Sequence, residues 1–274
     1  KCNLRFDDTN PIKEGVLQIS DEGEVVAIFE NRADLPKEKL EIFEGILCPG
    51  FVNAHCHLEL SHLLGMAEKR KGFLDFVGVV QKRYDFSKEE IQHSIGLAEK
   101  QMIANGIVAV GDMCNTIDTI PQKLKKNLQY YSFIGTLQVN KDKIKETIEK
   151  SKKIKKEFKR NQLQATIVPH APYSVHPKLM NEIITLMDEK DELICIHMQE
   201  TKEENELFEY KSGEFFDWLN SIKASSAIWE KRNKSTDVLE EIENRKILLV
   251  HNTFSKQEEM TDNFYCTCPK ANLY

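Results

Sequence analysis

The chain has 274 residues, of which 41% are hydrophobic and 30% charged, and its formal net charge is −6. This length and apolar content allow one large domain, or a large domain with a small companion. The negative charge gives no sign of nucleic-acid binding, and no apolar run approaches the roughly 20 residues of a membrane span. We therefore expect a protein that acts on a small molecule, without nucleic-acid or membrane partners.

The seven cysteines are dispersed along the chain, and none forms a Cys-x-x-Cys pair. An odd, scattered set argues against a disulfide framework and fits a reducing compartment. There is also no signal-peptide pattern. We expect a cytoplasmic protein, and a homodimer is compatible with the sequence.

Residues 1–48 are predicted to form a small β module. Apolar runs at 16–20 and 24–29 flank Asp21-Glu22-Gly23, a hairpin-type turn that places glycine where a positive φ is needed. After Pro49-Gly50 the pattern changes, so we expect a second domain over residues 49–274.

In this second domain, short apolar runs alternate with longer amphipathic segments. Seven such runs lie at 51–55, 106–113, 130–137, 164–170, 193–197, 246–251 and 264–268. The alternation predicts an α/β fold of βα units around a parallel sheet. Seven strands with helical spacers favour a (β/α)8 TIM-type barrel that lacks its last strand, and a doubly wound sheet is the alternative.

The segments between the strands are predicted to be helices, for example 88–106, 176–190 and 213–222. The Lys-rich run 141–160 interleaves Glu with Lys. Near-helical spacing relates four apolar side chains of this run: Ile144, Ile148, Ile154 and Phe158. This pattern is typical of an amphipathic helix with a solvated face, rather than of a patch that binds a polyanion.

Histidines end four of the seven predicted strands. His55 closes the first run and His57 follows two residues later, so both rings point to the same side of an extended strand. His170, His197 and His251 close three further strands. Alone, a His-x-His pair is a weak motif. Because the carboxyl ends of parallel barrel strands share one rim, however, the five rings should converge, which predicts a metal or catalytic site.

His55, His57 and His197 could supply three nitrogen ligands to one divalent metal, zinc or iron, with one position open for water. Such a metal lowers the pKa of its bound water from about 15.7 towards 7, which gives hydroxide at neutral pH. Glu200 follows His197 by three residues, where a carboxylate can carry the protons of the reaction. The alternative is that Glu200 belongs to the acidic cluster that follows and caps the next helix, the role that we assign to Glu203 and Glu204.

Further residues are candidates for substrate contacts at the same rim. His170 and His251 could each be a fourth ligand, or could polarise the substrate or steady the attacking water. Tyr173 could offer a hydroxyl or a stacking face. The segment after the first barrel strand is expected to cross the barrel mouth, where it could present Glu59, Phe73 and Phe76. The two phenylalanines could equally pack beneath that segment.

Five motifs, PGFVNAHCHLELSH, VPHAPYSV, HMQE, LLVHNTF and CPKANLY, occur in this order from residue 49 to the end. Together they resemble the amidohydrolase superfamily, in particular its cytosine deaminase-like and chlorohydrolase-like branch. The HCHLELSH variant is similar to aminodeoxyfutalosine deaminase-like proteins. The preceding module resembles part of the β-sandwich of that branch.

The resemblance implies a metal-dependent hydrolase on a TIM-type barrel. It implies that His55, His57 and His197 bind the metal and that Glu200 shuttles protons. It also implies that His251 contacts the attacking water or the substrate, and that His170 binds the substrate. The seventh-strand signature of the branch is matched by residues that we interpret as structural: Cys268, Pro269 and Asn272.

One departure from the family is expected to matter. The metal-binding aspartate of the family follows an eighth strand, and this sequence stops before such a segment. We hypothesise that the sequence is a fragment of a longer chain, and that without the aspartate it binds metal weakly and turns over slowly.

The leading functional hypothesis is hydrolytic deamination of an amino-substituted heterocycle, such as a purine or a nucleoside-like compound. Loss of chloride and cleavage of a cyclic amide are alternatives within the superfamily. A non-catalytic barrel that has lost a metal ligand is a third.

Overall fold

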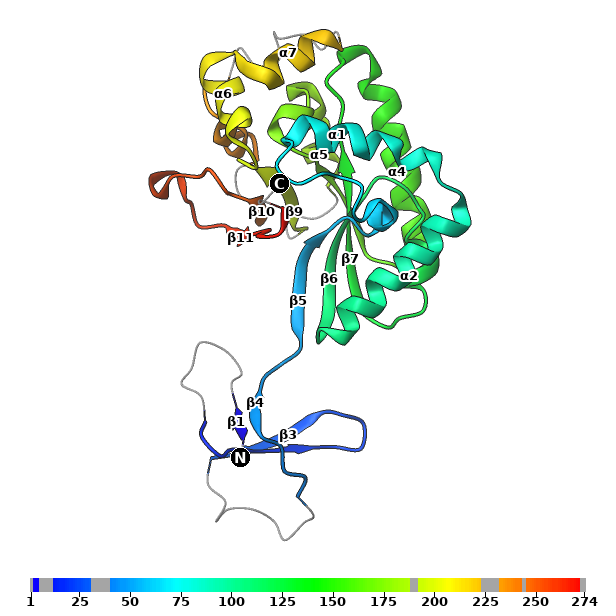
Figure 1. Cartoon of the computed structure of the whole chain (residues 1–274), viewed down its shortest axis with the longest axis vertical. Helices are drawn as coiled ribbons and strands as arrows, with labels where there is room; N and C mark the ends of the chain where they lie inside the picture. The colour runs from blue at the N-terminus through cyan, green and yellow to red at the C-terminus, as the bar shows by residue number, and fades with distance from the viewer. Residues whose placement is uncertain are drawn as a thin grey trace. The chain divides into compact units, whose positions relative to one another are not determined.

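The computed structural model describes residues 2–4, 12–30, 40–187, 192–222, 232–242 and 245–271. The chain divides into two compact units, Lys1–Phe51 and Val52–Tyr274 (Figure 1). Asn272, which the sequence assigns to the seventh-strand signature, lies outside the described residues.

The first unit contains short strands. β2 (Val16–Ile19) pairs antiparallel with β3 (Val25–Phe29), and the turn between them contains Gly23 at φ +86°. The predicted hairpin is therefore confirmed. β1 (Cys2–Leu4) pairs in parallel with β4 (Gly45–Leu47). The arrangement of these strands as part of a sandwich stays a prediction.

The second unit has one strand for each of the seven predicted apolar runs. They are β5 (Phe51–Cys56), β6 (Ile107–Cys114), β7 (Gln129–Thr136), β8 (Ala165–Pro169), β9 (Ile194–Met198), β10 (Ile247–His251) and β11 (Phe264–Cys266). Hydrogen bonds join them in the orders β5-β6-β7-β8 and β9-β10-β11, and the pairs β6–β7, β7–β8, β9–β10 and β10–β11 are parallel. The amide of His197 donates to the carbonyl of His170 at 3.0 Å, which links the two groups of strands.

Helices fill the connections between the strands. The α-helices are α1 (Phe73–Gln81), α2 (Lys88–Ala104), α3 (Ile120–Lys123), α4 (Ile144–Arg160), α5 (Pro177–Leu186), α6 (Lys202–Tyr210) and α7 (Gly213–Ser221). Short 3-10 helices are η2 (Leu58–Leu63), η3 (Lys82–Asp85), η4 (Lys141–Lys143), η5 (Pro172–Ser174), η7 (Ser235–Ile242) and η8 (Gln257–Glu259). In Figure 1, α2 and α4 lie beside strands β6 and β7. No helix in the described part of the chain is both long and apolar enough to cross a bilayer.

The strands alternate between two apolar layers. Ile194, Ile196 and Met198 of β9 pack with the inner faces of the helices, including the predicted buried residues of α4. Cys195 belongs instead to the cluster inside the barrel, with Phe133 and Val250. Since side chains two positions apart share a face, His197 lies on the same inward face as Cys195, at the end of the strand. The packing of Cys195 in the barrel interior therefore fixes the face of β9 on which His197 lies.

Candidate active site

Three histidine rings meet at the end of the barrel where the strands finish. His55 on β5, His57 just after β5 and His197 on β9 each bring one nitrogen within 4.8 Å of the other two. The Nε2 atoms of His57 and His197 are 3.1 Å apart. The ring of His55 is edge-on to both, with centroid distances of 5.0 and 4.8 Å. Tetrahedral zinc with Zn–N bonds of about 2.1 Å would separate its ligand nitrogens by roughly 3.4 Å, so this group fits a divalent ion.

The surroundings orient two of the three rings. The Nδ1 atom of His197 is 2.7 Å from the carbonyl oxygen of His170, so its N–H donates there and Nε2 keeps its lone pair for the site. The Nδ1 atom of His55 lies 3.8 Å from the Cys195 sulfur. By contrast, Nδ1 of His57 is buried and makes no hydrogen bond among the described residues.

Burial keeps these imidazoles uncharged in the metal-free protein. It lowers the pKa of His57 to about 4, and it holds the pKa values of His55 and His197 well below their usual range. The neighbouring imidazoles lower these pKa values further, since each protonated ring would repel the next. A neutral imidazole is the form that binds a metal, so the three rings are ready to bind at neutral pH.

His251 and Glu200 stand beside the three rings. His251 ends β10 with φ +77°, an uncommon backbone conformation for a residue other than glycine, and its ring centroid is 5.4 Å from that of His197. Its Nε2 atom is 3.4 Å from Oε1 of Glu200. Burial, and then the nearby charge of Glu204, raise the pKa of Glu200 to about 8. The carboxyl group can therefore both take up and release a proton near neutral pH.

Glu204 holds the turn that presents Glu200. Its carboxylate accepts hydrogen bonds from the amides of Gln199 and Glu200 at 3.0 and 3.1 Å. Its own amide donates to the hydroxyl of Thr201, the N-cap of α6. Burial raises the pKa of Glu204 to about 7, although these bonds oppose the shift. The cap of α6 is thus Thr201 rather than the side chain of Glu204, which bonds instead to the two amides before Thr201.

His170 lies between the metal candidates and the loop after β8. Its ring centroid is 4.6 Å from that of His197 and 6.4 Å from that of His57. Its Nδ1 atom is 3.0 Å from the hydroxyl of Ser174, and burial lowers its pKa to about 3. His170 is thus a neutral side chain close to the three-histidine group, as a substrate-binding role would require.

Tyr173 contacts both the site and a cluster of aromatic rings: its ring packs against His170 on one side and against Phe73 and Phe215 on the other. Its ring lies 5.8 Å from that of Phe73 on α1 and 5.2 Å from that of Phe215 on α7. Burial and the nearby Glu200 carboxyl raise the pKa of its phenol group. The hydroxyl is buried without a well-formed hydrogen bond to the described residues. Phe73 thus packs in this aromatic cluster and Phe76 lies against it, while contact of the two phenylalanines with substrate stays a prediction.

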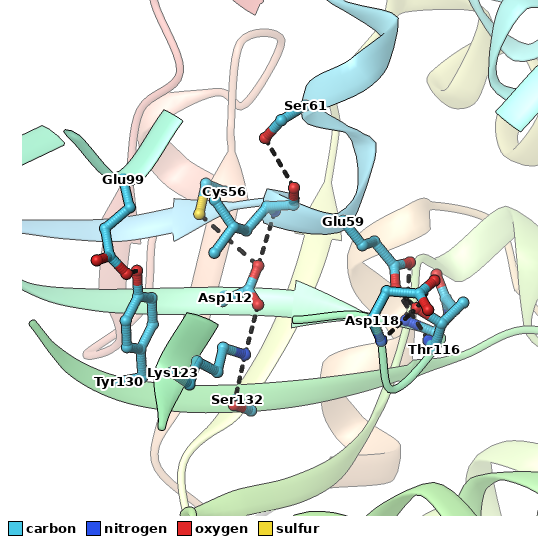
Figure 2. A network of polar contacts seen from close by, with 12 residues as sticks. Cys56, Glu59, Ser61, Glu99, Asp112, Thr116, Asp118, Lys123, Tyr130 and Ser132 are labelled. Atoms are coloured by element: carbon cyan, nitrogen blue, oxygen red, sulfur yellow. Dashed lines mark hydrogen bonds and ion pairs between the residues drawn. The ribbon is translucent and has the colours of Figure 1, made fainter. Parts of the chain in front are cut away.

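Glu59 is buried on η2 and bonds to the loop after β6. Its carboxylate accepts hydrogen bonds from the amides of Asn115 and Thr116, both at 2.9 Å, and from the Thr116 hydroxyl at 2.6 Å (Figure 2). Burial raises its pKa despite these bonds. Because both carboxylate oxygens are bonded within the protein, the contact with substrate stays a prediction, and the visible role of Glu59 is to hold the loop after β6.

An ion pair that was not predicted from the sequence lies beside this region. Asp112 of β6 and Lys123 of α3 are fully buried, with Oδ2 and Nζ 2.6 Å apart (Figure 2). The Lys123 ammonium also donates to the Ser132 hydroxyl at 2.8 Å. The signal in the sequence was an aspartate inside the apolar run of β6, because an acidic residue is rarely buried without a partner.

Several known proteins are similar to this chain in sequence or in fold. An adenosine deaminase of Helicobacter pylori is 24% identical over 283 residues, which cover 99% of this chain and 67% of the relative. The solved aminofutalosine deaminase of H. pylori, in complex with methylthio-coformycin, has a TM-score of 0.79 at 24% identity and covers 96% of this chain and 67% of that one. An atrazine chlorohydrolase of Arthrobacter aurescens, complexed with zinc, has a TM-score of 0.57 at 13% identity and covers 94% and 62%.

These matches support the TIM-type barrel and the resemblance found in the motifs. The chain spans about half to two thirds of the length of the relatives that it matches. Residues 46–274 match the amidohydrolase family as a whole. The chain belongs to the amidohydrolase family.

Proposed function

We propose that this chain carries the catalytic site of a metal-dependent hydrolase that removes the amino group from an adenosine-like heterocycle. The observation that carries the proposal is the placement at one rim of three neutral histidines with a Glu200–His251 pair beside them. The deaminases among its relatives support the adenosine-like substrate class.

His55, His57 and His197 would hold one divalent ion. Zinc is our first choice and iron the alternative, because both accept imidazole nitrogen, and the related chlorohydrolase structure contains zinc. When bound, the ion supplies Lewis acidity that lowers the pKa of a water molecule towards 7. The six cysteines whose state the structure describes are free, which fits the cytoplasmic location that the sequence suggests.

Glu200 would move the protons of the reaction. Water adds its oxygen to the ring carbon that bears the amino group, the bond from this carbon to the amino nitrogen breaks, and ammonia leaves. In these steps Glu200 would take a proton from the water and give it to the ring nitrogen. It would then take the second proton, from the newly added hydroxyl group, and give it to the departing amine, so that a ring carbonyl and ammonia remain. A carboxyl group with a pKa of about 8 is suited to exchange protons in both directions near neutral pH.

His251, His170 and Tyr173 would position the reactants. His251 lies 3.4 Å from Glu200 and beside His197, where it can orient the attacking water. His170 is neutral and next to His197, so it can hydrogen-bond a polar atom of the heterocycle. The buried Tyr173 hydroxyl is close enough to Glu200 to lower the pKa of its carboxyl group, against the larger effect of burial. Tyr173 can therefore bind substrate or hold the Glu200 carboxyl group in place.

The test is ammonia release from a panel of adenosine, 5′-substituted adenosines, aminopurines and aminopyrimidines with added zinc. Glu200→Gln should lower the rate by about 10²- to 10⁴-fold, the usual contribution of a general acid–base group. The matched control is Glu209→Gln, an exposed residue of the same helix region that should leave the rate unchanged. Undiminished ammonia release in Glu200→Gln would remove this residue from the mechanism. Chloride release from a chlorinated triazine, without ammonia release, would favour the chlorohydrolase alternative.

A further inference from the structure

We infer that Asp112 and Glu59 form a carboxylate clasp around the chain at His57 and are positioning residues for the metal site. The inference rests on the proposed function, because it assumes that His57 binds a metal. The two residues lie on β6 and η2, outside the group of three histidine rings. Figure 2 shows both carboxylates between the end of β5 and the end of β6.

His57 needs such support more than its partner His197 does. The His197 ring is tied through Nδ1 to the carbonyl of His170, whereas Nδ1 of His57 has no hydrogen bond among the described residues. The direction of the His57 ring must therefore come from its backbone and its packing. A metal ligand that is displaced by even a fraction of an ångström loses much of its binding energy, so the backbone at this position has to be fixed.

Asp112 holds the chain on both sides of His57. Its Oδ1 atom accepts a hydrogen bond from the amide of Leu58 at 2.8 Å and a weak one from the thiol of Cys56 at 3.8 Å. Cys56 precedes and Leu58 follows His57, so one carboxylate oxygen restrains both neighbours of the ligand. Gly111 allows the close approach, because a Cβ atom there would collide with the carbonyl of Ala54 on β5.

Lys123 forms a buried ion pair with the carboxylate of Asp112. The two side chains are fully buried at 2.6 Å, and the ammonium lies over the ring of Phe158 at 4.9 Å. A buried ion pair adds little stability compared with apolar residues of the same volume, because desolvation of both charges offsets their attraction. What the pair does provide here is a fixed position for the carboxylate: Oδ2 is held by the ammonium while Oδ1 accepts the amide of Leu58. The charge is therefore placed where it fixes the backbone beside His57.

Glu59 closes the clasp from η2, the 3-10 helix that follows β5. It lies two residues after His57 and accepts hydrogen bonds from the amides of Asn115 and Thr116, just beyond the end of β6. Asp112 thus reaches from β6 to the segment after β5, and Glu59 reaches from that segment back to the loop after β6. The two reciprocal connections leave the His57 backbone little freedom to shift along or away from β6.

The experiment measures metal binding in the full chain, independently of turnover. Zinc affinity is obtained by competition with a chromophoric chelator, and the ligand geometry is read from the visible spectrum of the cobalt-substituted protein. Asp112→Asn keeps the shape of the side chain but removes the charge, and it should weaken zinc binding by about 10- to 100-fold and change the cobalt spectrum. Glu59→Gln should likewise weaken zinc binding and change the cobalt spectrum.

The matched control is Glu99→Gln. Glu99 is also a buried carboxylate, and it accepts hydrogen bonds from Gln122, Asn127 and Tyr130 at 2.7–2.9 Å, yet these bonds do not reach the residues around His57. This variant should keep the zinc affinity and the cobalt spectrum of the wild type, even if its melting temperature falls. If Asp112→Asn does not fold, as judged by circular dichroism, Glu59→Gln carries the test.

Two negative outcomes are distinguishable. Failure of the wild-type chain to bind zinc or cobalt would overturn the metal site of the proposed function, and this inference with it. Wild-type metal binding with unchanged affinity and spectrum in both Asp112→Asn and Glu59→Gln would overturn the clasp alone.

Discussion

Buried carboxylates occur on two sides of the barrel rim, and they are held in different ways. On the β5–β6 side, Asp112 faces an ammonium and an amide, and both oxygens of Glu59 accept hydrogen bonds from the protein. On the β9–β10 side, Glu200 lies 3.4 Å from His251 and has a pKa raised to about 8. The first two groups are bonded into the fold, whereas the third can change its protonation state.

This difference separates structural from catalytic acids within one rim. A carboxylate that is surrounded by donors is fixed in position, and protonating it would break several bonds. A carboxylate that burial destabilises, next to an imidazole, exchanges its proton at little cost near neutral pH. The number and type of donors around each acid therefore indicate its role better than its distance from the histidines along the sequence.

The largest expected effect tests the structural side of the comparison. Lys123→Met removes the ammonium and leaves the Asp112 carboxylate buried without its counterion. We expect a loss of about 3–5 kcal/mol in the free energy of unfolding, because an uncompensated buried charge remains. Urea unfolding measures it. Lys155→Met is the control, since its pair with Glu192 is partly exposed and should contribute at most about 1 kcal/mol. Equal losses in both variants would contradict a special role for the Asp112 pair.

The next largest effect is expected on zinc affinity when one of the three proposed metal ligands is removed. Structural zinc sites with four ligands bind with about 10–16 kcal/mol, so one ligand contributes about 3 kcal/mol, on the order of 10²-fold in affinity. His57→Ala should weaken zinc binding of the chain by this factor. His176→Ala should not, because His176 only caps α5 by accepting a hydrogen bond from the Lys178 amide. Titration against a chromophoric chelator measures both, and an unchanged affinity in His57→Ala would exclude this ring as a ligand.

A pH series sharpens the contrast on the catalytic side. In the metal-free protein the pKa of Glu200 is about 8, above its ordinary value of 4.5, so the folded state holds this proton more tightly than the unfolded state. The contribution of this proton to the free energy of unfolding is therefore fully present below about pH 4.5, and it is lost as the pH rises through 8. Glu200→Gln avoids this loss and should exceed the wild type by roughly 1–3 kcal/mol at pH 9 but not at low pH.

Urea unfolding of the metal-free proteins at several pH values between 4.5 and 9 measures this difference. The exposed Glu209→Gln variant controls for the loss of one negative charge. A difference between wild type and Glu200→Gln that is the same at every pH would show that the folded state does not raise the pKa of Glu200.

The barrel and its histidines could be predicted because their signals are local. Each strand is a short apolar run, and His55, His197 and His251 stand at the ends of such runs, so parallel strand order alone brings them to one rim. The buried face of α4 follows in the same way from helical spacing. These features depend on periodicity, which a single sequence contains.

The carboxylate clasp could not be predicted because its signals are tertiary. Lys123 belongs to a short helix, and nothing in its local sequence indicates that its side chain enters the core. Glu59 was expected to face the substrate, yet its oxygens bond to amides that follow the next strand. Phe73 packs against Tyr173 and Phe215, which come from distant segments. Such pairings are set by how neighbouring βα units dock, and a sequence pattern shows only that an acid or an aromatic ring is present.

The smallest expected effect is the loss of a helix N-cap. The N-caps of α2 and α6 form a matched pair, because the glutamate in the first turn of each helix bonds to different amides. Ser87 caps α2, and Glu90 of that turn bonds back to the amide of Ser87 itself. Thr201 caps α6, but Glu204 of that turn bonds to the amides of Gln199 and Glu200. Ser87→Ala and Thr201→Ala should each cost about 1 kcal/mol in unfolding free energy.

Only Thr201→Ala should also lower the rate of ammonia release, because a loosened first turn of α6 moves Glu204 and so displaces Glu200 from His251. Thermal unfolding and steady-state rates of the two variants, with the pH dependence of the rate, measure the two effects separately. If both variants lose the same stability while Thr201→Ala keeps the rate and the pH profile of the wild type, the position of Glu200 does not depend on this cap. The position of the Glu200 carboxyl group would then be fixed by its contacts with His251 and Tyr173 rather than by the first turn of α6.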